Sequence, residues 1–404
     1  MSAQPHHPAH ADATDAALPP LRILLVHNAY QQRGGEDAVV DAEEALLRQH
    51  GHPVLRYQRH NDEVDGASRL QLARDTIWSP RTGRDIASVV RDFRPDVIHV
   101  HNSFPLISPS LFWAAHRAGV PVVQTLHNFR LICPQAMLLR EGRVCEDCVG
   151  HVPWRAVAHR CYRGSAAQSA AVAAMIQTHR VLGTWQHKVT RYIALNEFCK
   201  AKLVQGGLPA ERISVKPNFI DLPAPAPQER RGFLFVGRLS TEKGIDVLAR
   251  AAALLASPTP IIVAGTGPEE HRLRNSPHFH LLGSTRPEQV YEHMAGAMAL
   301  VLPSICFENF PRTLVEAFAN GLPVVASRLG ALESLVDHGR TGLLFEPGNA
   351  QDLAAKLRWA AEHPADMQRM GQAGRAEYEK NLTADANHRV LKAIYARAVA
   401  ESVG

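Results

Sequence analysis

Two glutamates in the segment 307–318, Glu308 and Glu316, stand eight positions apart. Pro311 favours the start of a helix, so we expect Glu308 in the loop before that helix and Glu316 one or two turns into it. Ionised carboxylates accept hydrogen bonds from hydroxyl groups, which suits recognition of a sugar or a ribose. On spacing alone, two surface acids near a helix N-terminus explain the pattern better.

A run from Gly237 to Gly244 places two cations, Arg238 and Lys243, directly after an apolar segment. Arginine can grip phosphate oxygens with its two-pronged guanidinium, and lysine acts as a point charge. The run connects an expected strand to an expected helix, whose N-terminus would add to the attraction for an anion. We therefore interpret it as a phosphate-binding loop in preference to a solvated polar loop.

Two pairs of glycines also follow expected strands. Gly34 and Gly35 precede the first helix, and Gly265 and Gly267 end a later strand. Backbone without side chains can approach a diphosphate closely at such places. Each pair fits a simple tight turn equally well, so neither pair decides the function alone.

Four of the six cysteines cluster in an insert at about 130–165 that contains one C-x2-C pair. The cluster predicts either a tetrahedral structural zinc site or four reduced thiols in a small loop region. A disulfide is the weaker alternative for a chain of this size and setting. The cysteines are Cys133, Cys145, Cys148 and Cys161, and His151 and His159 are substitute zinc ligands.

The same insert mixes aromatic and basic side chains. Such a surface can touch an anionic membrane that carries a lipid-linked acceptor, although a solvated basic loop fits somewhat better. No nucleic-acid-binding motif accompanies it, so we expect no nucleic acid among the partners. The side chains are Trp154, Arg155, His159, Arg160, Tyr162 and Arg163.

These candidate residues follow short apolar segments that alternate with helical patterns. The alternation predicts an α/β fold of doubly wound parallel sheets, in which ligands bind at the carboxyl ends of the strands. Expected strands cover 21–27, 53–57, 96–100, 121–126, 191–195, 232–237, 260–265, 299–303 and 323–326. Expected helices begin at about Asp37 and cover about 111–118, 165–181, 244–255 and 384–400.

The chain of 404 residues exceeds the size of a single core, and the proline-rich stretch 221–227 is the best linker. We expect a disordered leader over 1–20 and an N-terminal acceptor-side domain over 21–222 that contains the insert. We expect a donor domain over 223–383. The last segment, 384–404, is expected to form a helix that packs back on the N-terminal domain.

The composition is that of an ordinary globular protein, with 46% hydrophobic and 21% charged residues. The formal net charge of +5 suits a phosphate-bearing substrate or an anionic surface without establishing either. No apolar run reaches the roughly 20 residues that a bilayer span needs, and the first 20 residues lack the pattern of a secretory signal. A cytoplasmic location is the expectation, with the inner face of the plasma membrane as a variant of it.

In their order and spacing, the motifs resemble the family-4 glycosyltransferases, which have the GT-B fold. The resemblance covers about residues 21–378 and implies two Rossmann-like domains facing each other across a cleft. The glutamates match the E-x7-E signature of that family, and the loop 237–244 matches its Arg/Lys phosphate element. Further matches are Gly34-Gly35 to the N-terminal glycine loop, 216–218 to the P-N segment, and 329–333 and 339–345 to later glycine turns.

The resemblance implies roles on the donor side. Arg238 and Lys243 would hold the donor diphosphate and stabilise the leaving group. Glu316 would bind the donor ribose, and Glu308 would face the donor sugar. The implied donor site also includes Gly34, Gly35, Gly237, Gly265, Gly267, Asn309, Phe310 and Pro311.

On the N-terminal side, His127 follows an expected strand and matches the active-site histidine of the family. It would contact the donor sugar, although a histidine at a strand end is more often structural when taken alone. His99 and His101 would contribute to the acceptor side.

The reaction implied is sugar transfer with retention of configuration at the anomeric carbon. Arg238 and Lys243 would neutralise the charge that develops on the diphosphate. No cofactor or catalytic metal is expected, because no Asp-x-Asp is placed to hold one. Asn309 and Leu329 stand where the family often has glycine, so the donor sugar is not fixed by the resemblance.

The expected enzyme is a hexosyltransferase that uses a nucleotide-diphosphate sugar and a glycan or lipid-linked acceptor in cell-surface polysaccharide synthesis. An epimerase or a phosphorylase of the same fold is one alternative. A non-catalytic sugar-nucleotide-binding scaffold is another. The joint presence of Arg238, Lys243, Glu308 and Glu316 speaks against the scaffold.

Overall fold

A computed structural model of the chain describes residues 19–66, 68–223, 228–256 and 259–402. The expected leader lies outside these residues except for Pro19 and Pro20, and so does 224–227 of the expected linker. None of the described helices is long and apolar enough to cross a membrane.

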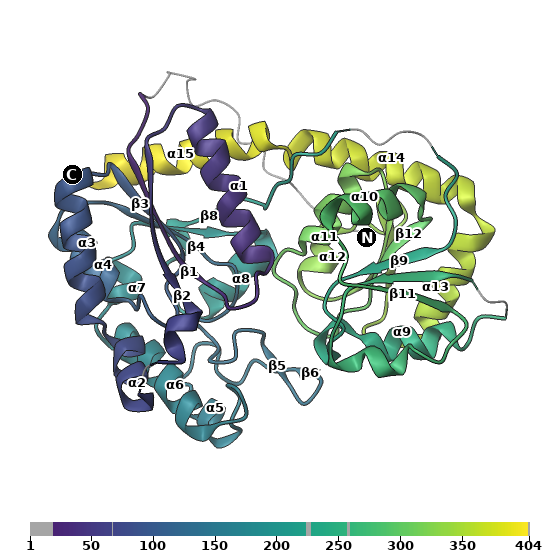
Figure 1. The fold of residues 1–404 in the computed structure, drawn as a ribbon, viewed down its shortest axis with the longest axis horizontal. Helices are drawn as coiled ribbons and strands as arrows, with labels where there is room; N and C mark the ends of the chain where they lie inside the picture. Colours follow the sequence, from purple (N-terminus) through teal and green to yellow (C-terminus); the bar gives the residue numbers. More distant parts are fainter. Residues whose placement is uncertain (1–18, 67, 224–227, 257–258, 403–404) are drawn as a thin grey trace, which may run out of the picture.

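The first sheet has six parallel strands in the order β2-β1-β3-β4-β7-β8 (Figure 1). The central strands β1, β3 and β4 are buried along their whole length, because helices cover both faces. The strands are β1 (Ile23–Ala29), β2 (Val54–His60), β3 (Val97–Asn102), β4 (Val122–Thr125), β7 (Arg191–Ala194) and β8 (Ile213–Val215).

The second sheet repeats this plan with the order β11-β10-β9-β12-β13-β14, again all parallel. Its strands are β9 (Phe233–Val236), β10 (Ile261–Ala264), β11 (Phe279–Gly283), β12 (Ala299–Leu302), β13 (Val324–Ser327) and β14 (Gly342–Phe345). The prediction of an α/β fold with two doubly wound parallel sheets is therefore confirmed.

Helices connect the strands of both sheets. Those of the first are α1 (Gly35–Gln49), α2 (Arg69–Ile77), α3 (Pro80–Phe93), α4 (Ser110–Arg117), α5 (Trp154–Ala158), α6 (Ala166–Val181), α7 (Thr184–His187) and α8 (Glu197–Gln205). Those of the second are α9 (Ile245–Ala252), α10 (Pro287–Gly296), α11 (Arg312–Ala319), α12 (Ala331–Leu335), α13 (Ala350–Glu362) and α14 (Pro364–Asn381). Short 3-10 turns cover Asn61–Val64, Ala210–Arg212, Thr241–Lys243 and Pro268–Arg272, and the insert forms a hairpin of β5 (Leu139–Arg140) and β6 (Arg143–Val144).

The last helix, α15 (Ala384–Ser402), returns to the first sheet (Figure 1). Its side chains Leu391, Ile394 and Tyr395 are buried in one apolar cluster with residues of β1, β3, β4 and β7. The C-terminal segment thus supplies part of the core on one face of the N-terminal sheet.

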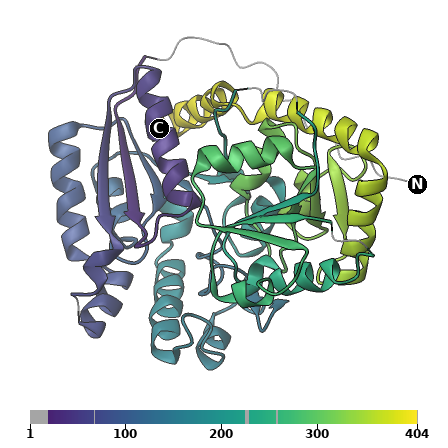
Figure 2. The ribbon, with the colours of Figure 1, turned by 45° about the vertical axis from the view of Figure 1, so that its right-hand side comes forward.

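The two sheet units meet through loops that follow strands (Figure 2). Asn196, just after β7, donates a hydrogen bond from its side chain to the carbonyl of Asn309, which follows β12. The rings of Phe198 and Phe307 pack edge to face with centroids 4.8 Å apart. The carboxyl edges of both sheets are therefore turned toward the same interface.

Two helical glycines offer a matched test of packing in this fold. A Cβ at Gly371 in α14 would lie 2.1 Å from the carbonyl oxygen of Gly321, whereas a Cβ at Gly83 in α3 would meet no heavy atom within 4 Å. We expect Gly371→Ala to destabilise the protein by about 1–3 kcal/mol through overpacking. Gly83→Ala should be neutral or stabilising by up to about 1 kcal/mol, because alanine favours a helix. Thermal unfolding followed by circular dichroism measures both, and equal melting temperatures would contradict the close helix-to-loop contact.

Candidate active site

In each sheet the chain order reverses next to the first strand of that sheet. β9 lies between β10 and β12, and β1 lies between β2 and β3. The loops that leave two such neighbouring strands diverge to opposite faces and open a crevice at the carboxyl edge, where ligands of α/β proteins bind. The candidate donor residues follow β9 and β12, and the glycine loop follows β1.

The loops after β9 and β12 bring Lys243 and Glu308 together. The Lys243 Nζ atom lies 2.7 Å from Glu308 Oε1, and Ser304 donates a hydrogen bond of 2.6 Å to the same oxygen. Burial raises the pKa of Glu308, but Lys243 and Ser304 outweigh it and hold that pKa below its ordinary value. Burial lowers the pKa of Lys243, but Glu308 outweighs it and leaves that pKa raised. Both groups are therefore charged at neutral pH.

Arg238 is the neighbouring cation in the same loop. Its side chain is exposed, and no acidic group within the described ranges forms an ion pair with it. Glu308 and Glu242 of the same loop balance the charges of Lys243 and Arg238, so the feature that is available to an anion is the exposed guanidinium itself. Such a place favours an anionic group with two or more oxygens.

The glycines after β10 have a packing function of their own. A Cβ at Gly265 would lie 2.0 Å from the carbonyl oxygen of Gly237, and one at Gly267 would lie 2.3 Å from that of Leu239. The loop after β10 therefore lies backbone to backbone against the loop that carries Arg238. Any side chain at Gly265 would displace that loop.

Helix α11 presents Glu316 and begins after Pro311, its N-cap residue. Glu316 Oε1 lies 2.9 Å from Arg312 Nε one turn earlier, and burial raises the pKa of this carboxyl. Phe310 is buried beneath the helix start. The side chain of Asn309 is turned toward α8, where its Oδ1 accepts a hydrogen bond of 3.1 Å from the Cys199 thiol.

On the N-terminal side, Asp37 holds the glycine loop in place. Its carboxylate accepts hydrogen bonds from the backbone N–H of Gly34 at 2.8 Å and of Tyr30 at 3.3 Å, and it pairs with His27 at 2.9 Å. Gly34 is the N-cap residue of α1, and a Cβ at Gly35 would meet nothing within 4 Å. The first turn of α1 is therefore fixed while the space above Gly35 is open.

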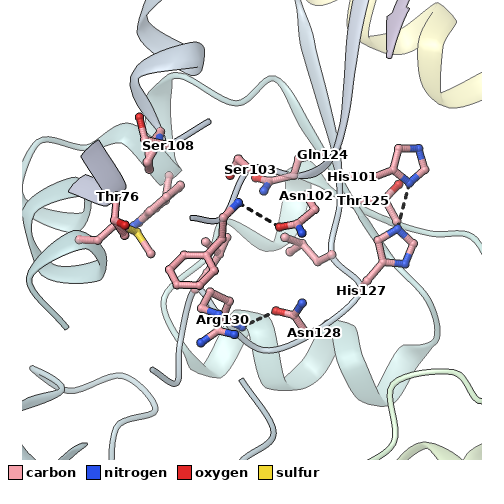
Figure 3. A pocket seen from close by; sticks show the side chains of 16 residues that line it. Thr76, His101, Asn102, Ser103, Ser108, Gln124, Thr125, His127, Asn128 and Arg130 are labelled. Carbon is pink, nitrogen blue, oxygen red and sulfur yellow. Dashed lines mark hydrogen bonds between the residues drawn. The ribbon is translucent and has the colours of Figure 1, made fainter. Parts of the chain in front are cut away.

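A pocket at the carboxyl ends of β3 and β4 lies beside this loop (Figure 3). Its lining includes Asn102, Gln124, His127, Asn128 and Arg130. The His127 Nε2 atom lies 2.9 Å from His101 Nδ1, the contact drawn in Figure 3.

Arg130, at the start of the cysteine-rich insert, lines this pocket and contacts Tyr162 from the far end of the insert. The Arg130 guanidinium lies against the rings of Phe104 and Tyr162, at 4.5 and 5.0 Å from their centroids, and the two rings contact each other edge to face. It also donates a hydrogen bond to the carbonyl of Pro134. Tyr162 belongs to the insert, so the insert forms part of the wall around Arg130.

The insert gives no support for zinc. The cysteine sulfur atoms, all within the described ranges, do not come together as a metal site. Within the described residues, the potential ligand atoms that lie within 4.8 Å of one another in a group of three or more belong to Glu43, His99 and His101. All six cysteines are unpaired, and burial raises the pKa of the Cys148 thiol to about 11.

Several site residues were missed by the sequence analysis. Glu36 is enclosed at the start of α1 with Tyr30 as its hydrogen-bond donor at 2.8 Å, and Arg130 lines the pocket at the start of the insert. Glu43 and Lys216 form a buried pair behind the pocket. Single acids and bases scattered over the sequence carry no local pattern, although the position of Glu36 directly after Gly34-Gly35 was an available signal.

Comparison with known proteins identifies the family. A model described as Glycosyltransferase Family 4 matches residues 33–223, and a model described as Glycosyl transferases group 1 matches residues 220–377. The chain belongs to the GT4-like glycosyltransferases of GT-B fold.

Individual relatives agree with this family. A D-rhamnosyltransferase, WbpZ, of Pseudomonas aeruginosa is 31% identical over 162 residues, covering 38% of this chain and 42% of the relative. A D-inositol 3-phosphate glycosyltransferase of Pseudarthrobacter chlorophenolicus is 31% identical over 312 residues, covering 69% of this chain and 66% of the relative. The matches to these two relatives thus span less than two thirds of their length.

Solved structures share the fold at low identity. A crystal structure of Anabaena HepE in complex with UDP has a TM-score of 0.66 at 19% identity and covers 93% of this chain and 100% of that chain. Sucrose-phosphate synthase of Thermosynechococcus elongatus has a TM-score of 0.69 at 18% identity, with 94% and 100% covered.

Glu36 makes the stability of this GT4-like chain dependent on pH. Burial raises the pKa of its carboxyl from 4.5 to about 8, whereas the unfolded chain has the ordinary value. Between these two values the native state holds a proton that the unfolded state releases, so the native state loses stability as pH rises, by up to about 1.4 kcal/mol per pH unit. Glu36→Gln stays neutral and should escape this loss.

We therefore expect the melting temperature of Glu36→Gln, minus that of the wild type, to be small at pH 5 and several-fold larger, and positive, at pH 8. Glu362→Gln, at the exposed end of α13, is the control for loss of a surface carboxylate. A difference that is the same at both pH values would show that Glu36 is ionised in the native protein.

Proposed function

We propose that this protein is a retaining glycosyltransferase that moves a hexosyl group from a nucleotide-diphosphate sugar to a glycan or lipid-linked acceptor. The observation that carries the proposal is the convergence of Arg238, Lys243 and Glu308 at the switch point of the second sheet. An exposed guanidinium beside a lysine–glutamate pair, at the carboxyl edge of a parallel sheet, fits a diphosphate joined to a sugar.

In this proposal the donor diphosphate lies against Arg238 and Lys243, near the glycines 237, 265 and 267. Lys243 is paired with Glu308 at 2.7 Å, so a bound diphosphate gives the ammonium a second anionic partner. Glu316 accepts hydrogen bonds from the ribose, and Glu308 faces the sugar. Gly34, Gly35, Asn309, Phe310 and Pro311 complete the donor site.

The chemistry follows from where charge develops. As the bond between the anomeric carbon and the diphosphate breaks, negative charge grows on the leaving group and the sugar gains oxocarbenium character. Arg238 and Lys243 are in place to stabilise that negative charge, and preorganised cations are the largest class of catalytic contribution. His127 contacts the sugar from the N-terminal side.

The type of donor is supported by structures of the same fold, since HepE was crystallised with UDP and with UDP-glucose. We further propose that residues 21–222 form the acceptor-side domain and 223–383 the donor domain. A polysaccharide acceptor agrees with the relatives, which include an amylovoran biosynthesis glycosyltransferase of Erwinia amylovora at 28% identity over 226 residues. The exposed Trp154, next to Arg155, supports a peripheral contact with an anionic membrane at the inner face of the plasma membrane.

Donor binding provides the first test. Calorimetry with a panel of nucleotide sugars should identify one that binds the wild type. Arg238→Ala should lower the affinity for this donor about 10- to 100-fold, because a hydrogen bond to a charged group contributes roughly 1.5–3 kcal/mol. Arg358→Ala removes an exposed arginine of the same sheet unit from the third turn of α13 and should bind like the wild type. Absence of binding to every nucleotide sugar at millimolar concentration would refute the donor site.

The stereochemistry is tested separately. With the donor found above and a suitable acceptor, proton NMR of the product should show the same anomeric configuration as the donor. An inverted anomer would refute retention. Donor binding without transfer to any acceptor would favour the sugar-nucleotide-binding scaffold.

A further inference from the structure

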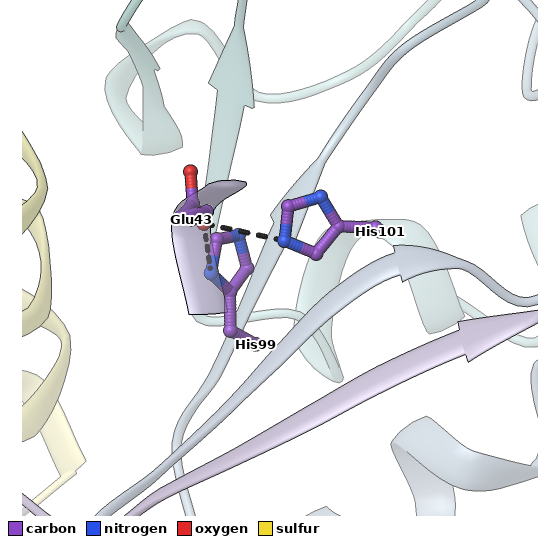
Figure 4. Close-up of side chains that lie close together, drawn as sticks. All are labelled: Glu43, His99 and His101. Carbon is purple, nitrogen blue, oxygen red and sulfur yellow. Dashed lines mark ion pairs between the residues drawn. The ribbon is translucent and has the colours of Figure 1, made fainter. Parts of the chain in front are cut away.

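Behind His127, buried polar side chains form a chain on the face of the N-terminal sheet that α1 and α15 cover. His127 Nε2 is 2.9 Å from His101 Nδ1, and His101 Nε2 is 3.2 Å from Glu43 Oε1. The other carboxylate oxygen of Glu43 accepts a hydrogen bond of 2.8 Å from Lys216 Nζ. Figure 4 shows Glu43 on α1 facing both His99 and His101 of β3.

The positions of the protons along this chain follow from elementary electrostatics. His101 Nε2 and Glu43 Oε1 are buried in close contact, and neither atom has a hydrogen-bond partner of good geometry within the described residues. The same Glu43 oxygen also lies 3.0 Å from His99 Nδ1. A lone pair on His101 Nε2 would face the lone pairs of a carboxylate at 3.2 Å, so the proton of this imidazole belongs on Nε2. His101 Nδ1 then accepts, and the atom that donates to it is His127 Nε2–H.

We propose that Glu43 and His101 are positioning residues that hold His127 in the Nε2–H form, so that its Nδ1 lone pair is presented to a hydroxyl of the bound sugar or acceptor. The proposal deepens the proposed function and rests on it, because it assigns an atom of His127 to substrate recognition. Glu43 acts through His101 and touches no substrate.

We call the chain from Glu43 through His101 to His127 the relay. Burial and the charged groups around Glu43 keep both imidazole rings of this relay neutral. Burial raises the pKa of Glu43, but Lys216, His99 and His101 outweigh it and hold that pKa well below its ordinary value. Burial, with His99 next, lowers the pKa of His101 to about 3. Burial likewise holds the pKa of His127 well below its ordinary value. The carboxylate is therefore ionised, and both rings of the relay are neutral, across the neutral range of pH.

The other titratable groups that face this cluster come from five parts of the chain. They are His27 of β1 with its partner Asp37, His99 of β3, Lys216 after β8 and Tyr395 of α15. Tyr395 contacts His99 Nδ1 at 2.7 Å, and its pKa is raised well above the ordinary value by burial. None of these groups supplies a second carboxylate to the relay, so Glu43 alone determines which nitrogen of His101 and of His127 carries the proton.

A metal ion held by Glu43, His99 and His101 is the competing interpretation, because their ligand atoms lie within 4.8 Å of one another. The Lys216 ammonium, 2.8 Å from Glu43 and fully buried, argues against it. It already balances the charge of the carboxylate, and a divalent ion beside it would meet strong repulsion in a poorly screened interior.

Glu43→Gln tests the relay because it keeps the shape of the side chain but reverses the direction of hydrogen-bond donation from His101 to residue 43. Lys216 can only donate, so the amide oxygen must face Lys216 and the NH2 group must face His101. His101 Nε2 then has to accept, its proton moves to Nδ1, and His127 Nε2 becomes the acceptor with the proton on Nδ1. Long-range proton–nitrogen-15 NMR of the substrate-free protein reports both tautomers directly.

The double variant Glu43→Gln/Lys216→Met is the matched control. It removes the ion pair as a unit, which proteins tolerate better than loss of one partner. The amide is then free to turn its oxygen toward His101, so the wild-type tautomers should return. His179→Asn, which removes a buried histidine of α6 that does not contact His127, controls for general loss of stability.

In the transferase assay we expect kcat of Glu43→Gln to fall about 10- to 100-fold with little change in the donor KM, as for loss of a group that orients an active-site imidazole. The double variant should recover most of the activity. If Glu43→Gln does not fold, His101→Phe keeps a ring in place and should leave His127 with a mixture of tautomers.

Each outcome is decisive. A wild-type His127 protonated on Nδ1, or a tautomer that Glu43→Gln leaves unchanged, overturns the relay. Reversed tautomers with unchanged kcat overturn the role of the Nδ1 atom. Because the NMR experiment needs no substrate, a protein that binds no nucleotide sugar but shows the expected tautomers would refute the proposed function and the role of Nδ1, while the positioning of His127 by Glu43 and His101 would stand.

Discussion

Parallel strands that are buried on both faces leave only their ends free for polar chemistry. The second sheet has an apolar interior, whereas the first also buries the histidines of β3, and in both sheets the charged and glycine-rich loops begin where β1, β3, β4, β9 and β12 end. Beside β1 and β9 the strand order reverses, so the loops that leave neighbouring strands there diverge to opposite faces of the sheet and leave room for a ligand. The positions of Arg238, Lys243 and Glu308 on one side, and of the glycine loop and His127 on the other, follow from this constraint.

The two edges are built differently. The donor edge keeps its charges near the surface, with Lys243 and Glu308 paired and Arg238 exposed. On the N-terminal edge, the charge is buried behind the site, where Glu43 and Lys216 are both almost completely inaccessible. A surface charge can bind an anion directly, whereas a buried charge acts on the substrate only through the side chains that it orients.

The sequence predicted the features that are local. The parallel sheets follow from short apolar segments, and the phosphate loop and the two glutamates stand in compact motifs that the structure places after β9 and β12. Helix α3 was missed although the signals were present, because Ser79 caps it, Pro80 stands in its first turn and its apolar residues fall on one face. Strand β8 is only three residues long, and β11 is partly exposed, so neither has a clear apolar run.

Long-range pairs lay beyond the sequence. Lys216 and Glu43 are 173 positions apart, and His99 and Tyr395 are 296 positions apart. No periodicity relates such residues, because the fold alone brings α1, β3, the segment after β8 and α15 to one point. The histidines of β3 were expected on the acceptor side, but their partners could be found only in three dimensions.

The return of α15 to the first sheet sets an order of events during synthesis on the ribosome. The strands of the N-terminal sheet are complete at residue 215, yet their outer face gains Leu391, Ile394 and Tyr395 only after the whole second sheet unit has been translated. Asn387, which contacts Lys216 at 3.1 Å, arrives equally late. During synthesis, part of the apolar face of the N-terminal half and the Lys216 side chain therefore stay incompletely covered until the last helix leaves the ribosome. Exposed apolar surface of this kind is bound by chaperones.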